Sequence, residues 1–427
     1  MYSSGWKRTY QNDTESMEQP IEPPSNRPLR VNQRAILLAT CAAGHGLKHL
    51  FNAAFFVLLP EIKMGLRLTN VQVGALTTIR NIAGGFANLP AGLVADRFGK
   101  HRAEILGGCL VATGAFAYML GISPNYWTVV FAAGLISVAI SFWHPAAIGS
   151  LAQQFANRRG FAIGIHGTGG SVGEAAGPIL AGALLSFVTW RFVSQVSLIP
   201  AIISGATVWI LLRGIPPDTV HTNTFKSYFV SVKRLLSNKK LLLVLLITGG
   251  FSGGQSTVLT FLPIYLREDL NVSTITLGVY LSLAHIAGIG SQPVMGLLSD
   301  RFSRKIILAP ALVLLSASIM ALGFVPPGFP LAVVVLIMGL FLFPMMAILL
   351  AAAMDLVEPD VQATTVSLVF GASVIVSGLA PAIAGRLADH FAIEITFVFS
   401  AIIVLASAVL ASVTHWSASD NRLPNHL

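Results

Sequence analysis

The chain is predicted to be an all-α polytopic membrane protein with twelve transmembrane helices in two pseudo-symmetric six-helix halves. Of its 427 residues, 54% are hydrophobic and only 11% are charged, which lies outside the range of soluble globular chains. Apolar runs of about 20 residues, the length that a helix needs to cross a bilayer, recur twelve times along it. A short charged phrase also occurs twice, around Asp96 and around Asp300.

The apolar runs divide the chain into two similar sets. The predicted helices are 35–59, 70–94, 103–121, 126–148, 160–186, 192–212, 241–265, 274–298, 306–325, 330–353, 363–386 and 394–415. The longest polar interruption falls in the middle. We therefore predict a disordered cytoplasmic tail (1–33), an N-terminal half (34–212), a cytoplasmic linker (213–240), a C-terminal half (241–415) and a second cytoplasmic tail (416–427).

Basic residues set the predicted orientation, because cytoplasmic loops carry an excess of lysine and arginine. With the N-terminus inside, twenty of the 27 basic residues fall on the inner side, five on the outer side and two within helices. Both termini are therefore predicted to be cytoplasmic, in a cell (plasma or inner) membrane. This topology explains the net charge of +9 without nucleic-acid binding. The two cysteines, Cys41 and Cys109, lie in apolar runs and predict no disulfide.

The repeat extends beyond the charged phrase. Leu59-Pro60 corresponds to Leu262-Pro263, and Gly74 corresponds to Gly278, at offsets of 203 and 204 residues. Two parallel copies joined by a loop are typical of secondary transporters, whose substrate sites lie between the halves near the middle of the bilayer.

The phrase Gly92-Leu-Val-Ala-Asp96-Arg97-Phe98-Gly99-Lys100 resembles the signature loop of the major facilitator superfamily, and the phrase that begins at Gly296 resembles its weaker second copy. Gly173-x-x-x-Gly177-Pro178-x-x-Ala181-Gly182 is similar to the motif of that superfamily's drug:proton antiporters, with Ala181 in place of a glycine. His49-Leu-Phe-Asn52 and Phe142-Trp143-His144-Pro145 resemble its fosmidomycin-resistance subgroup, an efflux family. The resemblance implies the major facilitator fold from about 34 to 415.

Asp96 ends its predicted helix at the cytoplasmic face, where a carboxylate interacts favourably with the positive end of a neighbouring helix by ~0.3 to 1 kcal/mol. The resemblance implies that this neighbour is the eleventh helix and that the contact latches the outward-facing state. The residues assigned to this latch are Gly92, Asp96, Arg97, Gly99, Arg102, Gly296, Asp300 and Arg301. The alternative is that they are ordinary loop charges.

Polar residues at helical spacing inside the apolar runs predict a central cavity, because a charge in the bilayer costs at least ~2.5 to 3.5 kcal/mol and is usually paired or functional. The candidate substrate-binding residues are Lys48, His49, Asn52, Arg80, Asn81, His144, His166, Glu174 and His285. The repeat partners of these residues are mostly uncharged: Arg80 corresponds to Ala284 and Glu174 to Ser377. The ionisable groups are therefore not required by the duplicated scaffold.

Two cations, Lys48 and Arg80, against one carboxylate, Glu174, predict an anionic substrate, and Arg80 can bind a carboxylate or phosphonate with two hydrogen bonds. The alternative is a structural ion pair of Glu174 with Lys48 or Arg80. Glu174, His144 and His166 are the candidate proton-coupling groups, although a lone histidine in a helix is more often a packing residue. Gly173, Gly177, Pro178 and Gly182 are predicted to pack helices closely, which is also common outside antiporters.

These observations favour secondary active transport of a small organic anion by alternating access, most simply as proton-coupled efflux by a monomer in the lipid bilayer. Proton-linked uptake is the main alternative, since the antiporters' fourth-helix arginine motif is absent from Gly134-Leu-Ile-Ser137. Proton-independent exchange and a non-transporting sensor are more remote. No catalytic constellation, cofactor motif or metal-ligand spacing is recognisable, so neither an enzyme nor a cofactor or metal site is predicted.

Overall fold

The computed structural model describes residues 30–215, 232–357 and 362–413, and every long element in these ranges is a helix. The helices of the first half are α1 (Val31–Leu66), α2 (Asn70–Arg97), α3 (Arg102–Ile122), α4 (Tyr126–Ser141), α5 (Trp143–Gln154), α6 (Arg159–Leu185), α7 (Trp190–Val196) and α8 (Leu198–Leu212). Short 3-10 turns, η1 (Gly99–His101) and η2 (Ala156–Arg158), precede α3 and α6.

The second half repeats this order. Its helices are α10 (Lys239–Ile264), α11 (Thr274–Phe302), α12 (Arg304–Ala321), α13 (Phe329–Leu342), α14 (Met345–Met354), α15 (Gln362–His390) and α16 (Ile395–Val413). A π-helical turn, η3 (Tyr265–Asp269), continues α10. The predicted boundaries of the linker and the tails stay predictions, because most of these residues lie outside the described ranges.

The observed helices match the predicted runs to within seven residues, and three runs are broken in the middle. The breaks lie between α4 and α5, between α7 and α8, and between α13 and α14. Each break is followed within three residues by a proline, namely Pro145, Pro200 or Pro344. Proline has no backbone N–H to continue the hydrogen-bond ladder and its ring clashes with the preceding turn, which favours a break at these points. Other prolines, such as Pro178 and Pro381, lie inside unbroken helices.

Among the described residues, ten helical segments are long and apolar enough to span a membrane. The two predicted spans that fall short are those of α2 and α6. Their sequences explain this, because α2 carries Thr77, Thr78, Arg80 and Asn81, and α6 is rich in glycine and contains His166 and Glu174. These two helices carry four of the nine predicted site residues, namely Arg80, Asn81, His166 and Glu174.

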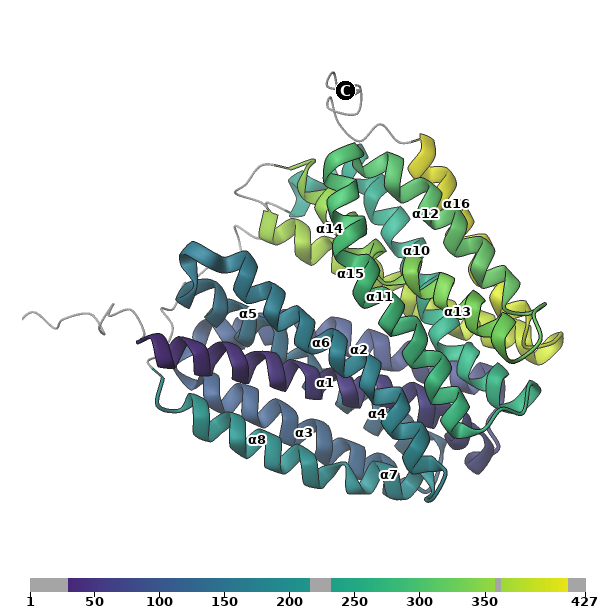
Figure 1. Ribbon diagram of the computed structural model, residues 1–427, viewed down its shortest axis with the longest axis horizontal. Helices are drawn as coiled ribbons and strands as arrows, with labels where there is room; N and C mark the ends of the chain where they lie inside the picture. The colour runs from purple at the N-terminus through teal and green to yellow at the C-terminus, as the bar shows by residue number, and fades with distance from the viewer. Residues whose placement is uncertain (1–29, 216–231, 358–361, 414–427) are drawn as a thin grey trace, which may run out of the picture.

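The two groups of helices meet at one end of the molecule and diverge toward the other (Figure 1). The contacts between the groups are made mainly by α2 with α15 and by α6 with α11. At the closed end, an added Cβ on Gly74 would collide with the backbone of Pro381, and one on Gly182 with the backbone of Thr274. These backbones approach so closely because glycine has no side chain.

At the other end, the same helices have separated. A Cβ built on Gly92 of α2, on Gly371 of α15, or on Gly290 and Gly296 of α11 would meet no other described atom within 4 Å. This end carries the beginning of α1 and the ends of α5 and α14 (Figure 1). In the predicted orientation, the closed end faces the outside and the open end faces the cytoplasm.

Ion pairs between the halves reinforce the closed end. Lys63 at the end of α1 pairs with Glu268 of η3, and Nε of Arg267 donates to Oε1 of Glu61 at 2.8 Å. The carboxylate of Asp389, at the end of α15, accepts from the first two backbone N–H groups of α2, at 2.8 and 2.9 Å. We call Glu61, Lys63, Arg267, Glu268 and Asp389 the outer clamp.

Candidate substrate site

The break before α5 places His144 in the first turn of that helix, facing α1. Nζ of Lys48 lies 2.6 Å from Nε2 of His144, so the lysine donates to the imidazole rather than to a carboxylate. Lys48 is 3% exposed. Among the described residues no acidic group lies within ion-pair distance of this ammonium.

Two further histidines lie beside this pair. The rings of His45 on α1 and His166 on α6 are stacked, with centroids 3.9 Å apart and an interplanar angle of 9°. Nδ1 of His45 lies 2.8 Å from the carbonyl oxygen of His166, and Nδ1 of His166 lies 3.1 Å from that of Cys41. Gly170 leaves the space that the His45 ring fills, since a Cβ there would come 2.5 Å from its Cε1.

Glu174 joins the two halves. Its Oε1 lies 2.7 Å from Nδ1 of His49 on α1, and its Oε2 lies 3.7 Å from Nδ1 of His285 on α11. Glu174 is therefore paired with histidines, and neither Lys48 nor Arg80 is its ion-pair partner. The side chain of Glu174 is 26% exposed although it lies at the interface between the halves, so solvent can reach it.

Arg80 is buried, with 4% of its surface exposed. Its Nη2 donates to Oδ1 of Asn52, and its guanidinium carbon lies 4.5 Å from the centroid of the Phe55 ring and 5.3 Å from that of Phe56. Aromatic faces stabilise a cation without neutralising it. In the part of the chain that the structure describes, no carboxylate lies within 4 Å of this guanidinium, and its Nε has no hydrogen-bond partner.

The remaining candidates are Asn81 on α2, which contacts the second half, and His285 on α11. The side-chain amide of Asn81 donates to Oγ of Ser256 at 2.8 Å and to the carbonyl of Ser377 at 3.1 Å. His285 packs on the ring of Phe343, with centroids 4.4 Å apart. The structure thus brings all nine candidate substrate-binding residues to the central part of the helices.

The antiporter-like glycines lie on two contact surfaces. An added Cβ on Gly173 would collide with the carbonyl of Gly46, and one on Gly177 would come 2.6 Å from the carbonyl of Leu50. Both contacts are with α1, whereas Gly182 contacts α11 of the other half. The glycines set the distance between α1 and α6 and therefore the relative positions of His49 and Glu174.

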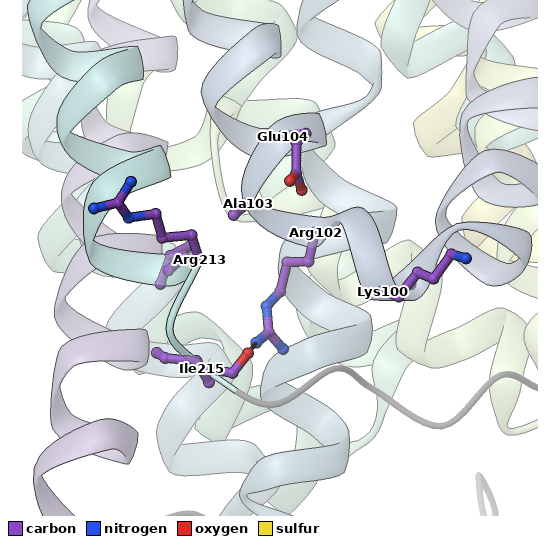
Figure 2. Close-up of a pocket in the computed structure, with 8 residues that line it drawn as sticks. Lys100, Arg102, Ala103, Glu104, Arg213 and Ile215 are labelled. Atoms are coloured by element: carbon purple, nitrogen blue, oxygen red, sulfur yellow. Dashed lines mark hydrogen bonds between the residues drawn. The ribbon is translucent and has the colours of Figure 1, made fainter. Parts of the chain in front are cut away.

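The predicted latch lies at the open end, and the side chain of Asp96 is outside the described residues. Arg97 is exposed, and Nη2 of the buried Arg102 donates to the carbonyl of Ile215 at 3.4 Å. Gly99, Lys100, Arg102 and Arg213 line a small pocket of about 40 Å³ at the start of α3 and the end of α8 (Figure 2). It has room for a few water molecules and not for a metabolite.

The second copy of the latch is paired within its own half. Asp300 pairs with Arg304, whose Nε also donates to Oδ2 of Asp355 at 2.9 Å. Arg301 lies over the ring of its neighbour Phe302. A Cβ added to Gly92 or to Gly296 would meet no described atom within 4 Å, as expected when this end is open.

Sequence reasoning missed the outer clamp and the His45–His166 pair. The clamp had a signal, because charged residues follow the repeated Leu-Pro pair in both halves, as Glu61 and Lys63 and as Arg267 and Glu268. His45 shares a helical face with Lys48 and His49. Nothing in the sequence indicates that its ring stacks on His166, 121 positions away.

Sequence comparison identifies the family of the chain. A sequence model of the Major Facilitator Superfamily matches residues 41–364 and 252–423, which together cover most of the chain. The protein belongs to the Major Facilitator Superfamily. It is therefore a multi-pass membrane transporter of small molecules and not an enzyme.

Relatives of this superfamily transporter differ in their cargo. It is 21% identical over 384 residues to a fosmidomycin resistance protein of Escherichia coli, covering 86% of this chain and 90% of the relative. It is 26% identical over 312 residues to a multidrug resistance protein MdtG of the same species, covering 68% and 73%. A probable 4-methylmuconolactone transporter of Cupriavidus pinatubonensis is 26% identical over 291 residues, covering 65% and 64%.

Solved structures agree with the fold. A bacterial homologue of the human lysosomal transporter Spinster, in an inward-facing and unoccupied conformation, superposes with a TM-score of 0.78 at 16% identity, covering 90% of this chain and 98% of the other. The nucleoside transporter NupG superposes with a TM-score of 0.74 at 13% identity, covering 88% and 99%. At this identity the likeness concerns the fold alone.

Proposed function

We propose that this transporter exports a small organic anion by proton exchange, across the cell membrane, with both of its termini in the cytoplasm. The proposal rests on two buried cations that lack a carboxylate partner among the described residues. Lys48 and Arg80 are almost fully buried, and within the described ranges neither has a carboxylate partner.

A buried cation without a counter-charge is unfavourable, since its hydration is lost and not replaced. An anionic substrate supplies the missing charge when it binds. The planar guanidinium of Arg80 suits a carboxylate, phosphate or phosphonate, and Asn52 and the rings of Phe55 and Phe56 hold it in place. Lys48, which lies on the same face of α1 as Asn52, contributes a second positive charge.

Proton coupling is assigned to Glu174, with His144 and His166 as further candidates. Glu174 contacts His49 in its own half and His285 in the other, so its charge state affects how strongly the halves attract each other. Loading a proton on Glu174 removes this attraction. A group that links protonation to the opening of the interface is what an exchanger requires.

Export is favoured by the relatives whose names describe resistance to fosmidomycin or to several drugs. Proton-linked uptake of an organic anion is the second candidate. It is favoured by the relative described as a probable 4-methylmuconolactone transporter and by the absence of the antiporters' fourth-helix arginine motif. The arrangement of Lys48 and Arg80 serves both directions equally.

The proposal is tested by reconstituting the purified protein in proteoliposomes and measuring flux of a panel of labelled organic anions, with and without an imposed pH gradient. We expect saturable flux of at least one carboxylate or phosphonate, accelerated by the gradient, and no flux of matched cations. Transport of cations but of no anion would overturn the assignment of an anionic substrate. Flux that does not depend on the pH gradient would overturn the assignment of proton coupling.

A further inference from the structure

We propose that His45, His144 and His166 form a binding site for a divalent transition-metal ion of the zinc class. One ring nitrogen from each of these three histidines lies within 4.8 Å of the other two. The three residues come from three helices, α1, α5 and α6, so the site exists only in the folded protein. Their dispersion along the chain explains why the sequence predicts no metal site.

The hydrogen bonds of His45 and His166 leave one nitrogen of each ring available. Both Nδ1 atoms lie next to backbone carbonyls, which can only accept, so Nδ1 carries the proton and Nε2 carries the lone pair. Both Nε2 atoms are buried and have no hydrogen-bond partner in the described structure. A carbonyl that fixes the tautomer of an imidazole is the usual second partner of a metal-bound histidine.

The third ligand, His144, is partly exposed. Bonds of about 2.0 to 2.1 Å to a tetrahedral ion would bring the nitrogens to about 3.3 Å from each other, so the rings must move inward by small side-chain rotations. Three imidazoles leave a fourth position for water or for an oxygen of a bound anion. Glu174, reached through His49, supplies negative charge nearby.

Lys48 competes with the metal for His144. Its ammonium already donates to Nε2 of this histidine, so it occupies the site as a tethered cation. Metal binding requires Lys48 to withdraw. Replacing Lys48 by an uncharged residue of similar length should therefore strengthen metal binding, whereas replacing a histidine should weaken it.

The test measures binding of Co²⁺ alone, by its visible absorption, and of Zn²⁺ by competition, to the purified full-length protein in detergent. We expect one equivalent per chain in the wild type, a loss of affinity of more than about 100-fold in His45→Gln/His166→Gln, and a gain of about tenfold or more in Lys48→Met. His101→Gln, a half-exposed histidine of η1 that lies outside the cluster, is the control and should bind like the wild type.

Thermal unfolding and gel filtration of each variant separate a lost ligand from a lost fold. The site is disproved if the wild type binds no stoichiometric Co²⁺, if the double variant binds it equally well, or if Lys48→Met weakens binding in a folded protein. Because no transport is measured, the outcome is independent of the assay for anion flux.

Discussion

At the scale of single residues, the central observation is the way in which opposite charges are kept apart. Glu174 is paired with two histidines, while Lys48 donates to a third histidine and Arg80 lies between an amide and two aromatic rings. The alternative of a structural ion pair between Glu174 and either cation is not what the structure contains. Lys48 and Arg80 are therefore available to pair with an anionic ligand.

Glu174→Gln tests the assigned proton-coupling residue. The variant keeps the shape of the side chain but cannot carry the charge that attracts His49 and His285. We expect gradient-driven flux of the anion to fall by about 100-fold, while exchange of internal for external anion, which needs no net proton movement, persists. The measurement is transport in proteoliposomes with and without a pH gradient.

The matched control is Glu104→Gln on α3, whose side chain is 54% exposed and far from the interface between the halves. It should transport like the wild type. Equal losses of gradient-driven flux and of exchange in Glu174→Gln would assign this glutamate to substrate binding and not to coupling.

The sequence predicted much of this site because bilayer energetics makes polar residues within apolar runs conspicuous. Lys48, Arg80, His144 and Glu174 were identified in this way, and the comparison of the two halves separated them from the scaffold. Their pairing was not predictable, because it depends on rotamers and on the break at Phe142 that turns His144 toward α1. The stacking of His45 on His166 was not predictable, because the two residues lie on different helices.

At the scale of helices, glycine determines how closely α6 approaches α1. Gly169, Gly173 and Gly177 each face the backbone of α1 at distances that a side chain could not occupy. Without a hydrophobic driving force between membrane helices, such close packing contributes much of their association. The same contact holds Glu174 against His49.

Gly173→Ala should separate α1 from α6, because the new Cβ would fall on the carbonyl of Gly46. We expect destabilisation of about 1 to 3 kcal/mol, seen as a lower midpoint of thermal unfolding in detergent. Gly164→Ala, on the same helix but with no described atom within 4 Å of the added Cβ, is the control. It should be neutral or slightly stabilising, since alanine favours helix more than glycine does. Equal stability of the two variants would contradict the packing role.

The helix boundaries were the most predictable part of the molecule, since an apolar run long enough to cross a bilayer leaves few alternatives. The breaks before Pro145, Pro200 and Pro344 were not expected. Proline inside a membrane helix is often tolerated, and whether it kinks or interrupts the helix depends on the neighbouring helices.

At the scale of the whole molecule, the two halves form one closed end and one open end. The outer clamp joins α1 to η3 and α15 to α2 at the closed end. Alternating access requires this end to open and the opposite end to close. The clamp therefore stabilises the conformation described here, and the latch predicted at Asp96 is expected to stabilise the opposite one.

Glu61→Gln/Glu268→Gln removes both carboxylates that pair across the clamp with Arg267 and Lys63. We expect the population to shift toward the conformation that is open at this end. Spin labels at the exposed Met64 and Ile275 should move apart, and labels at the exposed His101 and Phe302 should approach, in double electron–electron resonance distances. The native cysteines are both buried, so they should label poorly.

Glu104→Gln again serves as the control and should leave both distance distributions unchanged. Unchanged distributions in the double variant would show that glycine packing between α2 and α15, and not the ion pairs, holds the closed end.

The most direct test of the central claim compares two cargoes that differ only in charge. In proteoliposomes, exchange flux of an organic anion identified by the transport screen is measured beside that of its neutral amide analogue, for the wild type and for Arg80→Gln. If Arg80 binds the anion, the wild type should prefer the anion, and Arg80→Gln should reduce its flux by about 10- to 100-fold while leaving the slow flux of the amide unchanged. Equal flux of the two cargoes in the wild type, or an anion flux that survives the loss of Arg80, would contradict the account.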